Sequence, residues 1–195
     1  MERVGRVKRQ TRETNVEIDL ALNGKGKFDI NTGIGFFNHM LETIAKHAAL
    51  DLVVDGSGDI NVDYHHLVED TGIAFGSALK EALGDMKGVS RFGYASVPLD
   101  EALVEVSLDL SGRPYYKSNF SEFPGSAGDF NIELADVFFG GFASKGYTLH
   151  IVVMRGENRH HIIEAGFKAF AKSLKMAIEI DKSMADSVPS TKDYI

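Results

Sequence analysis

The sequence contains no cysteine, which excludes disulfide bonds and metal sites built on thiolates. It also lacks an apolar run long enough to cross a membrane, and runs such as 149–154 suit a buried strand instead. No apolar stretch of signal-peptide length follows the basic N-terminus, so we expect no export signal and a cytoplasmic location. Because the chain has no thiolate, any metal must be held by imidazole and carboxylate groups.

Positive charge is scarce, because 21 Lys and Arg stand against 28 Asp and Glu, a formal net charge of −7. Binding to a nucleic-acid backbone needs a basic surface, so nucleic acid is not an expected partner. The 195 residues are 44% hydrophobic and 25% charged. This composition is ordinary for a soluble globular protein that buries a core.

The same order of elements occurs twice along the chain. Alternating and helical hydrophobic patterns predict strand, helix, strand and long helix at 15–22, around 36–44, at 50–54 and at 65–83. The order recurs at 102–110, around 134–142, at 148–154 and at 160 to about 180. We therefore predict an internal duplication, with half-repeats at 1–92 and 93–195 in one compact unit.

Both long helices open with the motif His-His-x-x-Glu. The two segments that contain the motif read DYHHLVEDTGIAFGSALKEAL at 63–83 and NRHHIIEAGFKAFAKSLKMAI at 158–178. Two unrelated amphipathic helices would share an apolar stripe by chance, but they would not share this motif. The motif is therefore the main support for the duplication.

The motif also predicts metal binding. His65 and Glu69 are four residues apart and share a helix face, as do His160 and Glu164. The second histidine of each motif points about a quarter-turn or more away. Imidazole and carboxylate without sulfur suit Mn, Fe or Zn, and octahedral coordination favours Mn²⁺. A single such histidine would more often be a surface or capping residue, whereas two matched motifs favour ligands.

A further imidazole is available in one half only. Alignment of the halves through 50–54 and 149–153 sets Asn38-His39, to within one residue, opposite Asp136-Val137. His39 is the natural extra ligand, whereas Val137 cannot bind a metal, so the two metal sites are expected to differ. The two His-His elements of one chain do not readily supply all the ligands of two octahedral metal sites. We therefore predict that elements of neighbouring subunits pair across an interface.

Several basic and hydroxyl groups suit a phosphate. They are Arg91, Arg113 and the Ser190-Thr191-Lys192 segment of the C-terminal tail. Taken singly, each is better explained as a solvated surface charge. Composition alone therefore does not assign them.

Five segments resemble signature blocks of the imidazoleglycerol-phosphate dehydratase family, in order and over almost the whole chain. They are TGIGFFNHML (32–41), DYHHLVED (63–70), DLSGRPY (109–115), GENRHHIIEAGFKAFAKSL (156–174) and PSTK (189–192). The His-His blocks are highly specific. The resemblance implies an α+β fold in which each half is a two-layer α/β sandwich, a small sheet with helices on one face. It also implies a hydro-lyase of histidine biosynthesis that converts imidazole glycerol phosphate to imidazole acetol phosphate.

The resemblance further implies two Mn²⁺ per active site, at subunit interfaces of a 24-subunit homo-oligomer. The implied metal ligands are His39, His65, His66, Glu69, His160, His161 and Glu164. His47 and Lys168 would face the substrate, and the implied phosphate contacts are Arg91, Arg113, Ser190 and Lys192. The implied catalytic residues are Glu13, Glu69, Glu164 and Lys168.

The implied chemistry suits these groups. The proton to be removed lies beside an imidazole ring and is not acidic, but metals on the two ring nitrogens would stabilise an imidazolate. Hydroxide could then leave the neighbouring carbon. A carboxylate such as Glu69 or Glu13 would be the base, and the sequence leaves open which one.

Two departures from the family pattern bear on the metal sites. Many relatives carry Asp in place of Asn38 and His in place of Val137, while His150 lies in an apolar strand that favours a core or orienting role. Two alternatives stay open: a di-metal hydrolase on the same scaffold, and a non-catalytic metal-binding homologue. The basic residues suited to phosphate argue against the second alternative.

Overall fold

The computed structural model describes residues 3–192 and Tyr194. The first half forms a four-stranded sheet in the order β1-β2-β4-β3, in which the edge strand β3 runs parallel to β4 and the other pairs are antiparallel. Its elements are β1 (Val4–Gln10), β2 (Thr14–Ala21), β3 (Phe28–Asn31), α1 (Gly35–Ala48), β4 (Asp51–Gly58) and α2 (His65–Leu83).

The second half repeats this topology in the order β5-β6-β10-β7, again with a parallel edge strand. Its elements are β5 (Phe92–Leu99), β6 (Ala102–Asp109), β7 (Tyr115–Ser118), α3 (Glu133–Ala143), β10 (Thr148–Arg155) and α4 (Arg159–Ala177). A short hairpin, β8 (Ser126–Ala127) and β9 (Phe130–Asn131), precedes α3, and 3₁₀ turns lie at Phe120–Glu122 and Lys182–Met184. The expected duplicated α+β fold is confirmed, whereas the boundary at residue 92 stays a prediction.

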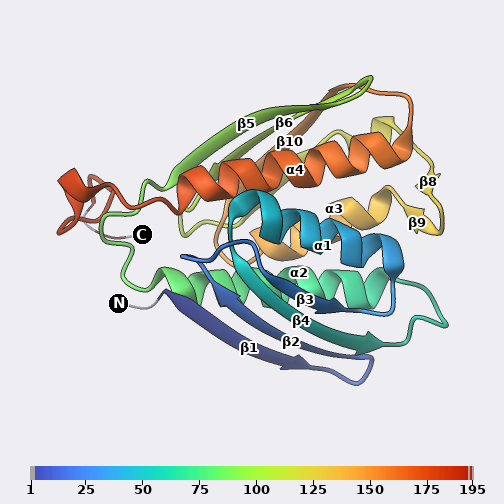
Figure 1. Cartoon of the computed structure of the whole chain (residues 1–195), viewed down its shortest axis with the longest axis horizontal. Coiled ribbons are helices and arrows are strands. Elements are labelled where there is room, and N and C mark those ends of the chain that lie inside the picture. The colour runs from blue at the N-terminus through green and yellow to red at the C-terminus, as the bar shows by residue number, and fades with distance from the viewer. Residues whose placement is uncertain (1–2, 193, 195) are drawn as a thin grey trace.

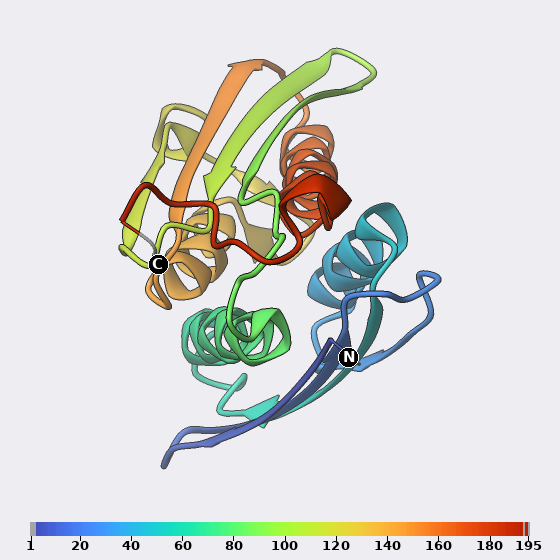
Figure 2. The ribbon, with the colours of Figure 1, turned by 90° about the vertical axis from the view of Figure 1, so that its left-hand side faces the viewer.

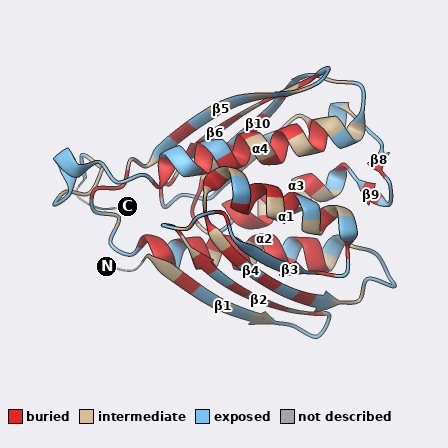
Figure 3. Cartoon of the chain, viewed as in Figure 1, coloured by how far each residue is buried: buried red, intermediate tan, exposed pale blue. Residues whose placement is uncertain are grey.

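The two sheets form the outer layers and the helices lie between them (Figure 1). Helix α2 packs on β1 and β2, and α4 packs on β5 and β6. The helix layers then meet, with α2 against α3 and α1 against α4 (Figures 1 and 2). Side chains that face the helices are buried, while the outer sheet faces are largely exposed (Figure 3). Within the described part of the chain, no helix is long and apolar enough to cross a membrane.

Phenylalanine rings fill the space where the four helices meet. Phe138 of α3 contacts Phe37 of α1, Phe75 of α2 and Phe167 of α4, with ring centroids 5.6, 6.3 and 5.3 Å apart. All four side chains are fully buried. Aromatic pairs at these separations add to the stabilisation from burial itself. The Phe138 cluster therefore fixes the two halves relative to each other.

Each half contains the same close approach of a strand to a helix. A Cβ on Gly5 would lie 1.9 Å from the carbonyl oxygen of Ala78 on α2, and one on Gly93 would lie 1.8 Å from that of Ser173 on α4. Gly5 pairs with Leu20 and Gly93 pairs with Leu108 at matching positions of the two sheets. Only glycine fits at these two positions.

Several expected boundaries were wrong. The sequence analysis did not find β1, β5 and β7, which lie at sheet edges and bury few side chains. Strand β4 continues to Gly58, beyond its expected end at residue 54, and α4 ends at Ala177 rather than near residue 180. The alternating burial of β4 and β10 makes Leu52, and not Leu50 as in the alignment of 50–54 with 149–153, the counterpart of Leu149. Part of the predicted tail, Asp193 and Ile195, lies outside the described residues.

The glycine contacts yield a stability prediction. Gly93→Ala should lower the free energy of unfolding by about 3 kcal/mol, because the added methyl group overlaps backbone atoms of α4. Gly35→Ala is the matched control, since its Cβ would meet nothing within 4 Å. Urea unfolding followed by circular dichroism measures both. A Gly93 variant as stable as the control would contradict the close packing.

Candidate functional site

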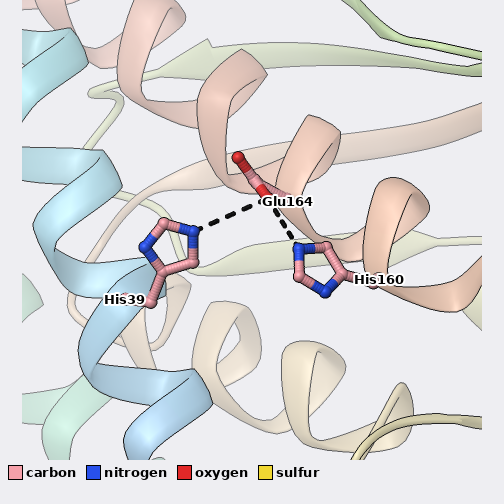
Figure 4. A group of neighbouring side chains, drawn as sticks. All are labelled: His39, His160 and Glu164. Atoms are coloured by element: carbon pink, nitrogen blue, oxygen red, sulfur yellow. Dashed lines mark hydrogen bonds and ion pairs between the residues drawn. The ribbon is translucent and has the colours of Figure 1, made fainter.

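Two histidines and a glutamate converge where α1 meets the first turns of α4. Their ligand atoms, from His39, His160 and Glu164, all lie within 4.8 Å of one another (Figure 4). His160 Nε2 is 2.9 Å and His39 Nε2 is 3.6 Å from Glu164 Oε2. The Asn158 side chain caps α4 by accepting hydrogen bonds from the backbone N–H groups of His160 and His161. The cap fixes the start of the helix and so the position of the motif.

The cluster has the donor set of a divalent metal site. Two imidazole nitrogens and one carboxylate oxygen supply three ligands, a common number for Zn²⁺ and a suitable partial set for octahedral Mn²⁺. The edge of the Phe36 ring packs against the His160 ring, with centroids 5.1 Å apart, and limits its rotation. The residues therefore fit a metal, with further coordination positions left for other groups.

Lys168 keeps the carboxylate of the cluster charged. Burial alone would raise the pKa of Glu164, but the ion pair with Lys168 at 2.7 Å and the hydrogen bond with His160 outweigh it, so the pKa is lowered. For His47, burial and the nearby cations Lys172 and Lys168 lower the pKa. Glu164 is therefore an anion suited to bind a cation, and His47 is a neutral imidazole on the side of α4 that carries Lys168.

The second histidine of each motif is held by a carboxylate that the sequence analysis did not single out. His66 Nδ1 lies 2.9 Å from Asp59, and His161 Nδ1 lies 2.7 Å from Glu101. These hydrogen bonds are the largest cause of the raised pKa of both histidines. When Nδ1 donates to the carboxylate, Nε2 carries the lone pair that can bind a metal.

Glu13 lies beside His66 on a turn that is tied to α2. Its Oε2 is 3.8 Å from His66 Nδ1. The Thr11 hydroxyl accepts hydrogen bonds from the backbone N–H groups of Glu13 and Thr14, and the Thr14 hydroxyl donates to the buried Asp70. Arg9 Nε completes this network by donating to Asp70 at 2.7 Å. A buried carboxylate next to Glu69 in sequence thus orients the turn that carries Glu13.

The structure does not form a matching triad at the other motif. Within residues 3–192 and Tyr194, the His39 cluster is the single group of three such ligands in reach of one another. His65 instead lines a pocket of about 520 Å³ together with Val137 of α3. Glu69 is exposed and does not line this pocket.

All four residues expected to contact phosphate line one pocket of about 870 Å³. They are Arg91, Arg113, Ser190 and Lys192. The Arg91 side chain is 14% exposed and is fixed by Asp109, to which Nε donates at 2.7 Å and an Nη at 3.2 Å. Its other Nη donates to the Pro189 carbonyl oxygen at 2.8 Å, which ties the C-terminal tail to the pocket. The Arg113 side chain is 69% exposed, with one Nη 3.8 Å from Asp109 Oδ2 and the other donating to the Ser111 carbonyl oxygen at 3.3 Å.

Helix α4 separates the pocket from the histidine cluster. His160 is in the first turn of α4, whereas Arg91 donates its backbone N–H to the Ala177 carbonyl oxygen at the last turn. The helix has 19 residues, so its two ends lie about 28 Å apart. One chain therefore holds the two candidate subsites at opposite ends.

Comparisons with known proteins agree with the fold and the motifs. The imidazoleglycerol-phosphate dehydratase family model matches residues 32–174. The dehydratase of Hydrogenovibrio crunogenus is 50% identical over 189 residues, which cover 95% of this chain and 96% of the relative. That of Caldanaerobacter subterraneus is 49% identical, with 99% and 100% covered.

Solved structures of two such dehydratases have the same fold. The Staphylococcus aureus enzyme has a TM-score of 0.79 and 36% identity, covering 91% of this chain and 99% of its own. The Pyrococcus furiosus enzyme, solved in complex with (S)-C348, has a TM-score of 0.84 and 34% identity, with 97% and 100% covered.

The fold, the duplicated motif and the full-length similarity define a hydro-lyase. The chain belongs to the imidazoleglycerol-phosphate dehydratase family, whose members are dehydratases of histidine biosynthesis. The resemblance inferred from the sequence is thereby confirmed. The roles assigned to individual site residues stay predictions.

The His161–Glu101 pair yields a pH prediction. The raised folded-state pKa of His161 means that the pair stabilises the fold below the ordinary histidine pKa, and that this stabilisation is lost as pH rises through the raised value. Glu101→Gln should therefore destabilise the metal-free protein more at about pH 5.5 than at about pH 8.5.

Urea unfolding at the two pH values measures the effect. Glu179→Gln is the control, since Glu179 has no ion-pair partner among the described residues. An equal loss of stability at both pH values would show that Glu101 does not set the protonation of His161.

Proposed function

We propose that the protein removes water from imidazole glycerol phosphate to give imidazole acetol phosphate, with two Mn²⁺ ions in each active site. The observation that supports metal dependence is the convergence of His39, His160 and Glu164 within 4.8 Å. Metal ions bound to the substrate ring nitrogens would withdraw electrons from the imidazole and make the adjacent C–H more acidic. The octahedral preference of Mn²⁺ suits three protein ligands with positions left open.

Glu13, one of the two carboxylates named as candidate bases, would take up the carbon-bound proton. Glu164 is held between His160 and Lys168 with its pKa lowered, which suits a ligand more than a base. Glu13 is more than half exposed and is fixed through its backbone rather than through its carboxylate. Its side chain is therefore free to reach a substrate while its turn stays in place.

Arg91 and Arg113 would hold the phosphate. Arg91 supplies rigidity, because Asp109 and the Pro189 carbonyl oxygen fix its guanidinium. Arg113 and Lys192 supply exposed donors around the same pocket, and the half-buried Ser190 adds a hydroxyl group. A guanidinium fork with hydroxyl and ammonium groups matches the geometry of a phosphate.

The distance between the two subsites supports an active site shared between chains. The substrate is a five-membered ring with a three-carbon phosphate chain, far shorter than the 19-residue helix that separates the pocket from the cluster. The metal end of one chain must therefore meet the phosphate end of another. A homo-oligomer, of 24 subunits by family resemblance, fits this requirement. The cytoplasmic location stays a prediction.

Metal removal tests the reaction. Metal-stripped protein should not dehydrate imidazole glycerol phosphate, and added Mn²⁺ should restore imidazole acetol phosphate, because the carbon-bound proton beside the ring is not acidic without the metal. Product formation is measured by mass spectrometry, with native mass recorded in parallel. An assembled, Mn²⁺-loaded protein without turnover would contradict the proposal. Release of inorganic phosphate instead would favour the hydrolase alternative.

Subunit mixing tests the shared site. His160→Asn and Arg113→Gln should each abolish most activity alone, whereas coexpressed variants should recover activity in up to about a quarter of the sites by random pairing. The matched control is the double variant His160→Asn/Arg113→Gln expressed alone. It offers no intact combination of the two subsites. No recovery in hybrids of native mass would place both subsites within one chain.

A further inference from the structure

The two halves place different residues at the same position of their short helices. Burial runs in parallel along α1 and α3, so that the buried pair Met40-Leu41 corresponds to Phe138-Phe139 and Ile44 corresponds to Phe142. The same correspondence sets His39 opposite Val137. The alignment expected from the sequence is thus supported by the packing of both helices.

The consequence for ligand supply is direct. His39 extends from α1, and its Nε2 lies 3.6 Å from Oε2 of Glu164, the glutamate of the motif on α4. Val137 extends from α3 into the pocket that contains His65 of α2, with an isopropyl group that cannot donate to a metal. The pocket of about 520 Å³ leaves room for an imidazole at this position.

The carboxylates of the two motifs also differ in their support. Lys168, one turn after Glu164, holds that carboxylate at 2.7 Å. The residue one turn after Glu69 is Ile73, which offers no charge, and Glu69 is exposed. The motif on α4 has a third ligand, His39, and a cation that orders its glutamate, Lys168. The motif on α2 lacks both features.

We infer that the two metal sites of this chain are unequal. The site at His39, His160 and Glu164 binds a divalent cation tightly, and the site at His65 and Glu69 binds it weakly because position 137 supplies no donor. This inference rests on the proposed metal dependence and specifies how the metals are distributed. Loss of an orienting partner alone weakens metal sites about 10- to 100-fold, so loss of a ligand should cost at least about 10-fold.

Titration of the assembled metal-free protein with Mn²⁺ tests the inference, with free Mn²⁺ measured by electron paramagnetic resonance. The wild type should show one tight and one weak ion per chain, with dissociation constants at least about 10-fold apart. Val137→His should convert the weak class to a tight one. His39→Val, the converse exchange, should leave weak binding only. Native mass and circular dichroism verify that each variant is folded and assembled.

Three results would overturn the inference. Two Mn²⁺ ions per wild-type chain with equal dissociation constants would overturn the inference and leave the proposed metal dependence intact. A tight second site that disappears in Glu133→Gln would show that this carboxylate, which lines the same pocket, replaces the missing imidazole. Absence of any Mn²⁺ binding would overturn both the inference and the metal dependence, so the two failures are distinguishable. The Mn²⁺ titration of His39→Val does not depend on the other variant, so it tests the inference even if Val137→His does not fold.

Discussion

The packing of four helices around Phe138 is the contact on which the site depends. Each half is a sheet that covers only one face of its own helices, so the other helix faces must be buried against the other half. Phe138 contacts rings from all three other helices. Removing such a buried ring typically costs about 3–5 kcal/mol, a large part of the total stability of a domain. The meeting of His39 on α1 with Glu164 on α4 is a direct result of this packing.

The parts of the fold that could be predicted are those with a strong periodic signal. Helix α2 begins at His65 and ends at Leu83 as expected, because a long apolar stripe is bounded by the motif and by Gly84. Strands β1, β5 and β7 escaped detection because an edge strand buries little, and its pairing depends on a neighbour distant in sequence. The arrangement with helices inside and sheets outside depends on contacts between halves, which periodicity does not encode.

The site shows the same division between local and distant information. The candidate ligand types were readable because one motif recurs, and the residues expected to contact phosphate do line one pocket. Their supporting carboxylates were not readable. Asp59 is seven residues before His66, whereas Glu101 is 60 residues before His161. The carboxylate bonded to the histidine comes from different elements in the two halves. A comparison of repeats sets Glu101 opposite Glu13, which lies 3.8 Å from His66 Nδ1, but it would not have found Asp59.

The histidine motifs also stand in a particular electric field. Both open long helices, α2 at His65 and α4 at Arg159, where the aligned peptide dipoles give the helix end a partial positive charge. That field disfavours a cation and favours an anion. Carboxylates gathered around these ends, including Asp59, Glu101 and Glu164, oppose it. Part of the acidic surplus of the chain thus compensates the macrodipoles, and neutralising Asp59 or Glu101 would leave the helix field less compensated at these ends.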